Sequence, residues 1–154
     1  MPTEGPSLRR CETADLSQVS RVERDSFPDR PYTTLDFVAY LLIAREGFIV
    51  ASLGGAVVGY VIALSRGREG VIQSIAVSPE ARGRGVGERL MRSAIDHLSR
   101  SSSRVRLLVA AGNEAGIGLY RKLSFEETGK VIPGYYPDGD DAVEMERELG
   151  PPAQ

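Results

Sequence analysis

The chain has 154 residues, a formal net charge of -2 at pH 7, one cysteine and one histidine. A single domain of this length buries a core without disulfides or metals, and the charge gives no electrostatic reason to expect nucleic acid as a partner. The single cysteine has no disulfide partner, and the one histidine adds too little for a metal cluster, so we expect no metal. No apolar run approaches the ~20 residues of a membrane span, and the start lacks a signal-peptide core. We therefore expect a cytoplasmic protein with no membrane partner.

One domain spanning residues 1–154 is expected, with frayed ends at 1–6 and 150–154 that are rich in proline, glycine and small residues. A weak first strand over 7–12 is followed by a helix that Thr13 opens and that breaks near Pro28. This helix carries at helical spacing Leu16, Val19, Val22 and Glu23. Thr33 or Thr34 caps a second helix, which carries on one face Leu35, Val38, Ala39 and Leu42.

The second half of the chain alternates strands and helices. Strands over 48–51 and 56–64 are joined by a hairpin signal, and a third apolar run covers 71–77. A helix with a wide apolar stripe then ends near Ser101. The remaining elements are a strand over 104–109, a helix from Asn113, and strands around 125–132 and 142–149. The fold class is α/β, and this order requires both parallel and antiparallel connections.

Three glycines, Gly83, Gly85 and Gly87, stand at alternate positions between the run 71–77 and the following helix. A glycine-rich turn at a helix start exposes backbone N–H groups that have no partner inside the helix. With the positive end of the helix dipole they form an anion site, most naturally for phosphate. Arg82 and Arg84 add positive charge beside it.

Two familiar phosphate motifs do not fit this turn. A Walker loop needs Lys and Ser or Thr after its last glycine, and a dinucleotide fingerprint needs a different last spacing. The stretch Arg82-Gly-Arg-Gly-Val-Gly87 fits a third pattern, Gln/Arg-x-x-Gly-x-Gly/Ala. A plain flexible connection between strand and helix is the remaining alternative.

Through the stretch from Ile75 to Gly87 the sequence resembles the GCN5-related N-acetyltransferase (GNAT) superfamily. A second motif, Asn113-Glu-Ala-Gly-Ile-Gly-Leu-Tyr-Arg-Lys-Leu-Ser-Phe125, follows at the family's distance, with Ser124 in place of the usual glycine. That departure affects a helix C-cap more than chemistry. The resemblance implies a GNAT fold: a mixed, mostly antiparallel sheet of about seven strands, splayed between the fourth and fifth, flanked by about four helices.

The resemblance also implies acetyl-coenzyme A as the acetyl donor. Its pantetheine would lie along the backbone of Ile75, Ala76 and Val77, and Asn113 would bond to it unless Asn113 is only a helix cap. A backbone N–H near Val77 would meet the charge that develops on the thioester oxygen. Tyr120 would act as general acid on the departing thiol, or else pack in the core. The pyrophosphate would be cradled by Arg82, Gly83, Arg84, Gly85, Val86, Gly87 and Glu88.

The general base is less evident. The ribosomal-protein alanine acetyltransferases, which the chain otherwise resembles, carry a glutamate on the fifth strand, where this sequence has Leu108. Gln73 on the fourth strand is no base either. Asp29 lies where some N-terminal acetyltransferases carry a catalytic glutamate in a loop, which makes it the candidate base. A solvated loop aspartate and a water relay remain alternatives.

The acceptor is indicated by the loop 134–142, which resembles the Gly-Tyr-Tyr loop of archaeal and eukaryotic protein N-terminal acetyltransferases. Tyr135 and Tyr136, with Tyr32, would bind a peptide, and the loop aspartates would favour a cationic amine nearby; a simple hairpin turn is the alternative. Three hypotheses stay open: acetylation of a protein or peptide α-amine, acetylation of a small amine, and a non-catalytic acyl-coenzyme A sensor. The oligomeric state is not predicted.

Overall fold

A computed structural model of the chain describes residues 5–151, so the ends predicted to fray lie mostly outside the described residues. It contains one seven-stranded sheet in the order β1-β2-β3-β4-β5-β7-β6. The strands are β1 (Ser7–Arg10), β2 (Phe48–Leu53), β3 (Ala56–Arg66), β4 (Glu69–Val77), β5 (Arg104–Ala110), β6 (Glu126–Ile132) and β7 (Ala142–Glu148). The helices are α1 (Leu16–Ser26), α2 (Thr34–Ala44), α3 (Val86–Leu98) and α4 (Glu114–Lys122), with short 3-10 turns η1 (Thr13–Asp15), η2 (Arg45–Gly47) and η3 (Pro79–Ala81). The predicted element order and the GNAT architecture are confirmed.

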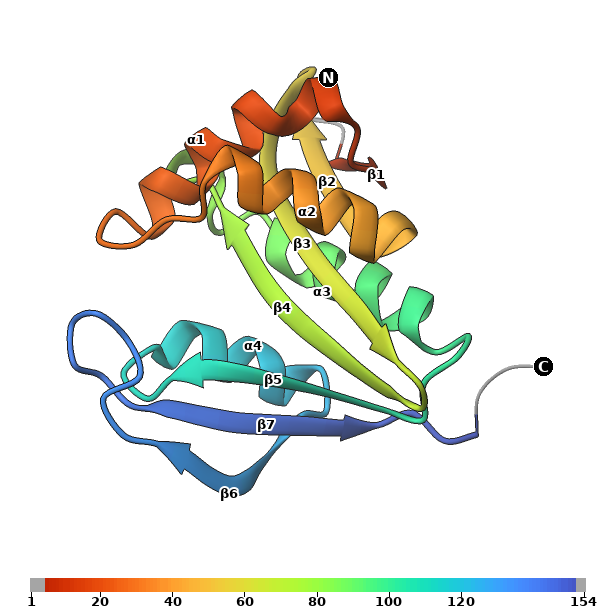
Figure 1. The fold of residues 1–154 in the computed structure, drawn as a ribbon, viewed down its shortest axis with the longest axis vertical. Helices are drawn as coiled ribbons and strands as arrows, with labels where there is room; N and C mark the ends of the chain where they lie inside the picture. Colours follow the sequence, from red (N-terminus) through yellow and green to blue (C-terminus); the bar gives the residue numbers. More distant parts are fainter. Residues whose placement is uncertain (1–4, 152–154) are drawn as a thin grey trace.

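The sheet divides between β4 and β5. Within residues 5–151 these two strands form the only parallel pair, and their pairing covers Glu69–Ile72 against Arg104–Leu107. Beyond Ile72 the strands part, as Figure 1 shows, leaving a gap between two halves of the sheet. On its other side β4 keeps pairing with β3 up to Val77, with a bulge at Gln73 between the paired residues Ile72 and Ser74. The predicted splay between the fourth and fifth strands is therefore present.

Apolar side chains that point alternately to the two faces of the strands form two hydrophobic cores, one on each face of the sheet. In β2, Phe48 and Val50 join a cluster with α1 and α2, whereas Ile49 and Ala51 join a cluster with α3 and α4. The period-2 pattern of a strand places neighbouring side chains on opposite faces, so the sheet is covered by helices on both sides. No helix within residues 5–151 has the length and apolar character needed to cross a membrane.

Helix α2 differs from the sequence expectation in the face that it buries. Thr33 caps it as predicted, accepting a hydrogen bond from the Asp36 backbone N–H. The predicted apolar face is exposed, with Leu35 at 77% and Leu42 at 72%. The helix packs instead through a second apolar set, Phe37, Tyr40, Leu41 and Ala44. Because α2 is apolar almost all round, its periodicity does not select one face.

Helix α4 ends in a Schellman motif. The backbone N–H of Ser124 donates to the carbonyl of Arg121, and that of Phe125 donates to the carbonyl of Tyr120, both at 2.9 Å. Ser124 has a φ of 69°, the left-handed conformation that glycine adopts without penalty. The serine that replaces the family's glycine is therefore strained, at the helix C-cap where the sequence analysis expected this departure to act.

We expect Ser124→Gly to raise the free energy of unfolding by about 1 kcal/mol, because glycine removes the Cβ that disfavours this conformation. Ser124→Ala keeps the Cβ and serves as the matched control. Urea denaturation of the three proteins measures the difference. Equal stability of the glycine and alanine variants would contradict the assignment of strain.

Candidate active site

The glycine turn has the geometry of an anion site. Gly83 and Gly85 have φ values of 78° and 76°, and Gly85 is the N-cap of α3. The first hydrogen bond of the helix joins the Arg89 N–H to the Gly85 carbonyl at 3.1 Å. The N–H groups of the three residues between them consequently have no partner inside the helix. Together with the helix dipole they suit the phosphates of the acetyl donor.

A cavity of about 590 Å³ extends from this turn between α3 and α4 to the free edge of β4. The predicted donor-binding residues come together here, apart from the exposed Arg84, which does not line the cavity. Those lining it are Ile75, Ala76, Val77, Arg82, Gly83, Gly85, Val86, Gly87, Glu88, Asn113 and Tyr120. Since β5 has parted from β4 here, the β4 backbone offers hydrogen-bonding groups of the kind that a pantetheine amide needs.

Charged side chains close the outer edge of this cavity. Glu88 on α3 pairs with Lys122 on α4 at 2.5 Å and with Arg92 at 3.3 Å. These hydrogen bonds, the one from Lys122 first, lower the pKa of Glu88. A carboxylate repels phosphate, so the part of Glu88 suited to the predicted role is its backbone N–H. Arg82 lies nearby and donates from Nε to the Val77 carbonyl at 3.2 Å.

Asn113 fits both roles that the sequence left open. It is the N-cap of α4, and its side-chain oxygen accepts from the Gly116 N–H at 3.0 Å. Its side-chain NH₂ group has no hydrogen-bond partner among residues 5–151, and Asn113 is one of the residues that line the donor cavity. The cap therefore leaves two donors available to a ligand.

Tyr120 lies where two cavities meet. It lines the donor cavity and a narrower one, of about 170 Å³, between the parted strands. The side chain is 7% exposed and packs edge-on against Phe125, with ring centroids 6.1 Å apart. Burial, and secondarily the nearby Tyr136, raises the pKa of Tyr120 to about 12. Its hydroxyl therefore keeps its proton at neutral pH.

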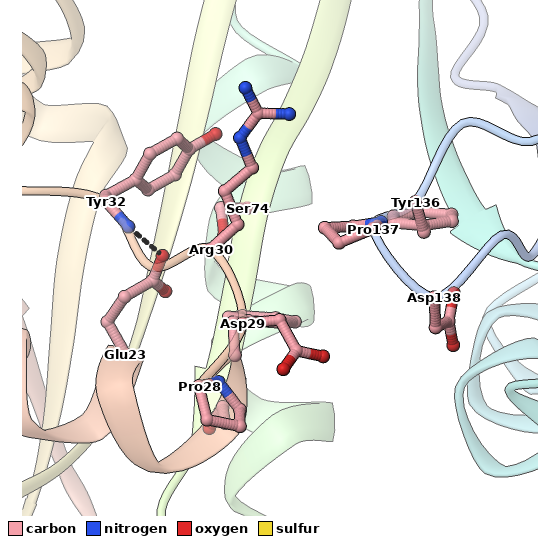
Figure 2. A pocket seen from close by; sticks show the side chains of 11 residues that line it. Glu23, Pro28, Asp29, Arg30, Tyr32, Ser74, Tyr136, Pro137 and Asp138 are labelled. Carbon is pink, nitrogen blue, oxygen red and sulfur yellow. Dashed lines mark hydrogen bonds between the residues drawn. The ribbon is translucent and has the colours of Figure 1, made fainter.

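A further cavity, of about 330 Å³, lies between the α1–α2 loop and the β6–β7 loop. Figure 2 shows Asp29 on one side with its carboxylate directed towards the space between the loops, and Tyr136 and Asp138 on the other. We call this the acceptor cavity. Of the predicted residues, Asp29, Tyr32 and Tyr136 line it, while Tyr135 lines an adjoining cavity of about 260 Å³ that Tyr32 and Tyr136 also border.

Contacts of their own hold Tyr32, Tyr135 and Tyr136 in place where they line these two cavities. The Tyr32 hydroxyl accepts a hydrogen bond from Gln73 on β4 at 3.2 Å, which ties the α1–α2 loop to the point where the strands part. The rings of Tyr135 and Tyr136 are nearly perpendicular, with centroids 5.0 Å apart. Burial raises the pKa values of Tyr32 and Tyr136 to about 12, so both are neutral hydrogen-bonding groups at physiological pH.

The aspartates of the β6–β7 loop are already engaged with backbone groups. Asp138 accepts from the Asp140 N–H, and Asp141 accepts from the Gly134 N–H, both at 2.9 Å. Asp140 accepts from the Gly112 N–H at 2.9 Å and so fastens this loop to the start of α4. These bonds hold the loop in shape, as the alternative reading of 134–142 as a simple hairpin turn implies. Of the three aspartates, only Asp138 lines the acceptor cavity.

Where β4 and β5 part, the described residues Gln73 and Leu108 offer no carboxylate, but α1 supplies one that the sequence analysis did not interpret. Leu108 lines the narrow cavity, and no acidic residue among those described lines it. Glu23 lines the acceptor cavity and is only 2% exposed. The one sequence signal was its position: Glu23 occurs at the helical spacing of the buried residues of α1.

Comparison with known proteins identifies the family. The model of the Acetyltransferase (GNAT) family matches residues 13–125. The chain belongs to this family. It is accordingly an acetyl-CoA-dependent N-acetyltransferase, and acetyl-coenzyme A is its acetyl donor.

Similar proteins cover nearly the whole chain. An N-alpha-acetyltransferase of Saccharolobus solfataricus is 31% identical over 93% of this chain and 93% of its own. The N-alpha-acetyltransferase RimI of Mycobacterium tuberculosis is 31% identical over 98% of both chains. The crystal structure of Ard1 from Thermoplasma volcanium superimposes with a TM-score of 0.88 at 28% identity, covering 94% of this chain and 98% of the other.

We expect Gly87→Ala to weaken acetyl-coenzyme A binding at least tenfold. A Cβ built at Gly87 lies 3.6 Å from a Leu119 methyl and 3.8 Å from a Val77 methyl, so the fold accommodates it. The new methyl group nevertheless occupies the wall of the donor cavity beside the phosphate-binding turn. Gly87 is preferable to Gly85 for this test, because the positive φ of Gly85 would strain any other residue.

The matched control is Gly118→Ala, on α4, where a Cβ meets nothing within 4 Å and the residue is exposed. Isothermal titration calorimetry compares the two variants with the unmodified protein. Unchanged affinity in Gly87→Ala would remove the glycine turn from the donor site.

Proposed function

We propose that this enzyme acetylates the N-terminal α-amine of a protein or peptide. The supporting observation is that the acceptor and donor cavities converge on the parted strands, where Phe27 lines both of them and the narrow cavity as well. An amine entering between the two loops would meet a thioester arriving along β4. The names of the similar proteins, which are N-alpha-acetyltransferases, point in the same direction.

The acceptor cavity suits an extended peptide end. Its walls are aromatic rings with neutral hydroxyls, from Tyr32 on one loop and Tyr136 on the other. Such walls offer large apolar area and hydrogen bonds to a peptide backbone at low cost in side-chain entropy. The exposed carboxylate of Asp29 at the edge adds a negative charge that attracts an ammonium group.

The chemistry of amines favours the same acceptor. An α-amine has a pKa near 8, whereas a lysine amine has a pKa near 10.4 and is harder to deprotonate. No carboxylate on β4 or β5 among the described residues lines the narrow cavity, so strong assistance by a strand residue is lacking there. Asp29 is the base that the sequence suggests.

Tyr120 would donate its proton, or a hydrogen bond, to the sulfur of coenzyme A as the carbon–sulfur bond breaks. An ordinary thiol has a pKa near 8.5, so complete transfer from a phenol of pKa about 12 is uphill by roughly 3.5 units. The favoured contribution is therefore a hydrogen bond that stabilises the departing thiolate. On the other side, a backbone N–H of β4 near Val77 would stabilise the charge that develops on the thioester oxygen.

Tyr120→Phe should lower kcat by on the order of 10²-fold, because it removes the donor and keeps the ring. Affinity for acetyl-coenzyme A should change little, which calorimetry checks alongside steady-state kinetics. A kcat equal to that of the unmodified enzyme would assign Tyr120 to packing alone.

The acceptor class is tested with paired peptides of one sequence. One peptide has a free N-terminus and no lysine, and the other has a blocked N-terminus and one lysine. Release of free coenzyme A should be much faster with the first peptide, because its amine is partly neutral at pH 7.

A panel of polyamines, amino acids and other small amines is assayed in parallel. A small amine preferred over every peptide would replace the peptide acceptor. Tight binding of acetyl-coenzyme A with no turnover on any amine would favour the sensor hypothesis.

A further inference from the structure

Glu23 is held at the inner end of the acceptor cavity by two hydrogen-bond donors. The Tyr60 hydroxyl donates to Oε1 at 2.5 Å, and the Tyr32 backbone N–H donates to Oε2 at 2.9 Å. Tyr60 is fully buried on β3, and its hydroxyl lies 2.9 Å from Oγ of Ser74 on β4. Three side chains from three elements therefore form one continuous chain of hydrogen bonds.

The direction of this chain follows from the number of protons available. An ionised Glu23 only accepts, so Tyr60 must give its single proton to Glu23. Ser74 must then donate to the Tyr60 oxygen, which leaves the lone pairs of Ser74 Oγ unused. Ser74 lines both the acceptor cavity and the narrow cavity between the strands. The chain of hydrogen bonds thus begins at the Ser74 oxygen, which can accept a hydrogen bond where the amine would arrive. It ends on the buried carboxylate of Glu23.

We propose that Ser74 meets the acceptor ammonium and that Glu23, acting through Tyr60 and Ser74, takes its proton. This inference rests on the proposed acetylation of an α-amine. It supplies the base that the strands do not carry, and it gives a role to a buried charge that is otherwise expensive to maintain.

The proton balance is complete. The ammonium gives one proton to Ser74, Ser74 gives its own to Tyr60, and Tyr60 gives its own to Glu23, which becomes a neutral carboxylic acid. The freed lone pair forms the carbon–nitrogen bond, the carbon–sulfur bond breaks, and its electrons leave on sulfur. After attack the nitrogen loses its second proton to water, the thiolate takes one proton from water, and Glu23 later returns its own to solvent, so one proton is released overall.

The surroundings of Glu23 favour proton uptake. Burial is the main cause that raises the pKa of Glu23, opposed by the bonds from Tyr60 and Tyr32. Asp36 on α2 raises it further through its negative charge. The other charged groups at the cavity are Asp29 and Arg30 on the α1–α2 loop and Asp138 on the facing loop. These three are exposed, so solvent screens their influence.

The test is the pH profile of kcat/KM for a free α-amine peptide with the unmodified enzyme and with Glu23→Gln. The glutamine keeps an oxygen that accepts from Tyr32, but it cannot take a proton. We expect Glu23→Gln to be slower by on the order of 10²-fold at pH 6.5, where the α-amine is protonated. At pH 9.5, where the amine is already neutral, the two enzymes should agree within about threefold.

Ser74→Ala should show the same pH-dependent deficit, since it interrupts the chain at its outer end without touching Glu23. It also keeps the test available if Glu23→Gln does not fold. Asp25→Asn is the control on α1, because Asp25 is exposed and lines none of the cavities described. Its profile should match that of the unmodified enzyme.

Three results would overturn the proposal. The first is a loss in Glu23→Gln that is equal at all pH values, which indicates that Glu23 only positions the Tyr32 loop. The second concerns an aminooxy-acetyl peptide, whose nitrogen is neutral at pH 6.5 and needs no base. If Glu23→Gln is slower than the unmodified enzyme by the same factor on this peptide as on the α-amine peptide, Glu23 does not act by taking a proton. The third is a pH-dependent deficit in Asp29→Asn instead, which would make Asp29 the base.

If the unmodified enzyme acetylates a small amine but no peptide, the proposed peptide acceptor is wrong. The same pH profile measured on that amine then still tests the role of Glu23.

Discussion

Pairing between β4 and β5 stops after Ile72 and Leu107, and the whole site depends on that interruption. An unpaired backbone edge in the middle of a sheet is unfavourable where it is buried without partners. Here the edge opens onto the donor and narrow cavities, where water or a ligand can satisfy it. The bulge at Gln73 helps to turn β4 away, because a bulge bends and twists the strand that carries it. The arrangement that weakens the sheet is thus the one that exposes peptide groups to the donor.

Each half of the divided sheet supplies one wall of the acceptor cavity, and one carboxylate fixes each wall. On the β4 side Glu23 accepts the Tyr32 backbone N–H and so holds the α1–α2 loop. On the β5 side Asp140 accepts the Gly112 backbone N–H and holds the β6–β7 loop. Charge-assisted bonds of this kind are stronger than neutral ones and suit loops that must keep a shape. The separation of the walls is then set by the packing of the two halves and not by the loops alone.

How much of the site could be predicted from the sequence depends on the range of the interactions involved. The glycine turn, the Asn113 cap and Tyr120 belong to two short segments whose local pattern predicts the structural element of each and a role for it. The strand order and the splay followed from the family resemblance that these segments carry. The chain from Glu23 to Ser74 escaped prediction because Glu23 and Tyr60 are 37 residues apart and meet only in the folded sheet. The buried face of α2 escaped because two apolar faces compete in its sequence, and only packing against Phe48 and Tyr60 decides between them.

In the proposed reaction the positions of Ser74 and Tyr120 would separate the two proton movements. Nitrogen would lose its proton on the β4 side, through Ser74, while sulfur would be stabilised from α4, through Tyr120. Burial raises the pKa values of both Glu23 and Tyr120, with opposite consequences. The carboxylate becomes a better base, whereas the phenol becomes a weaker acid and, in the proposed mechanism, would serve as a hydrogen-bond donor. An ordinary carboxylate lies about 3.5 units below an α-amine, which corresponds to roughly 5 kcal/mol, and about 6 units below lysine, roughly 8 kcal/mol. A raised glutamate pKa narrows both gaps by the same amount, so deprotonating lysine stays harder than deprotonating an α-amine by about 2.5 units, roughly 3.5 kcal/mol. This difference in free energy is a physical reason for such a site to select α-amines.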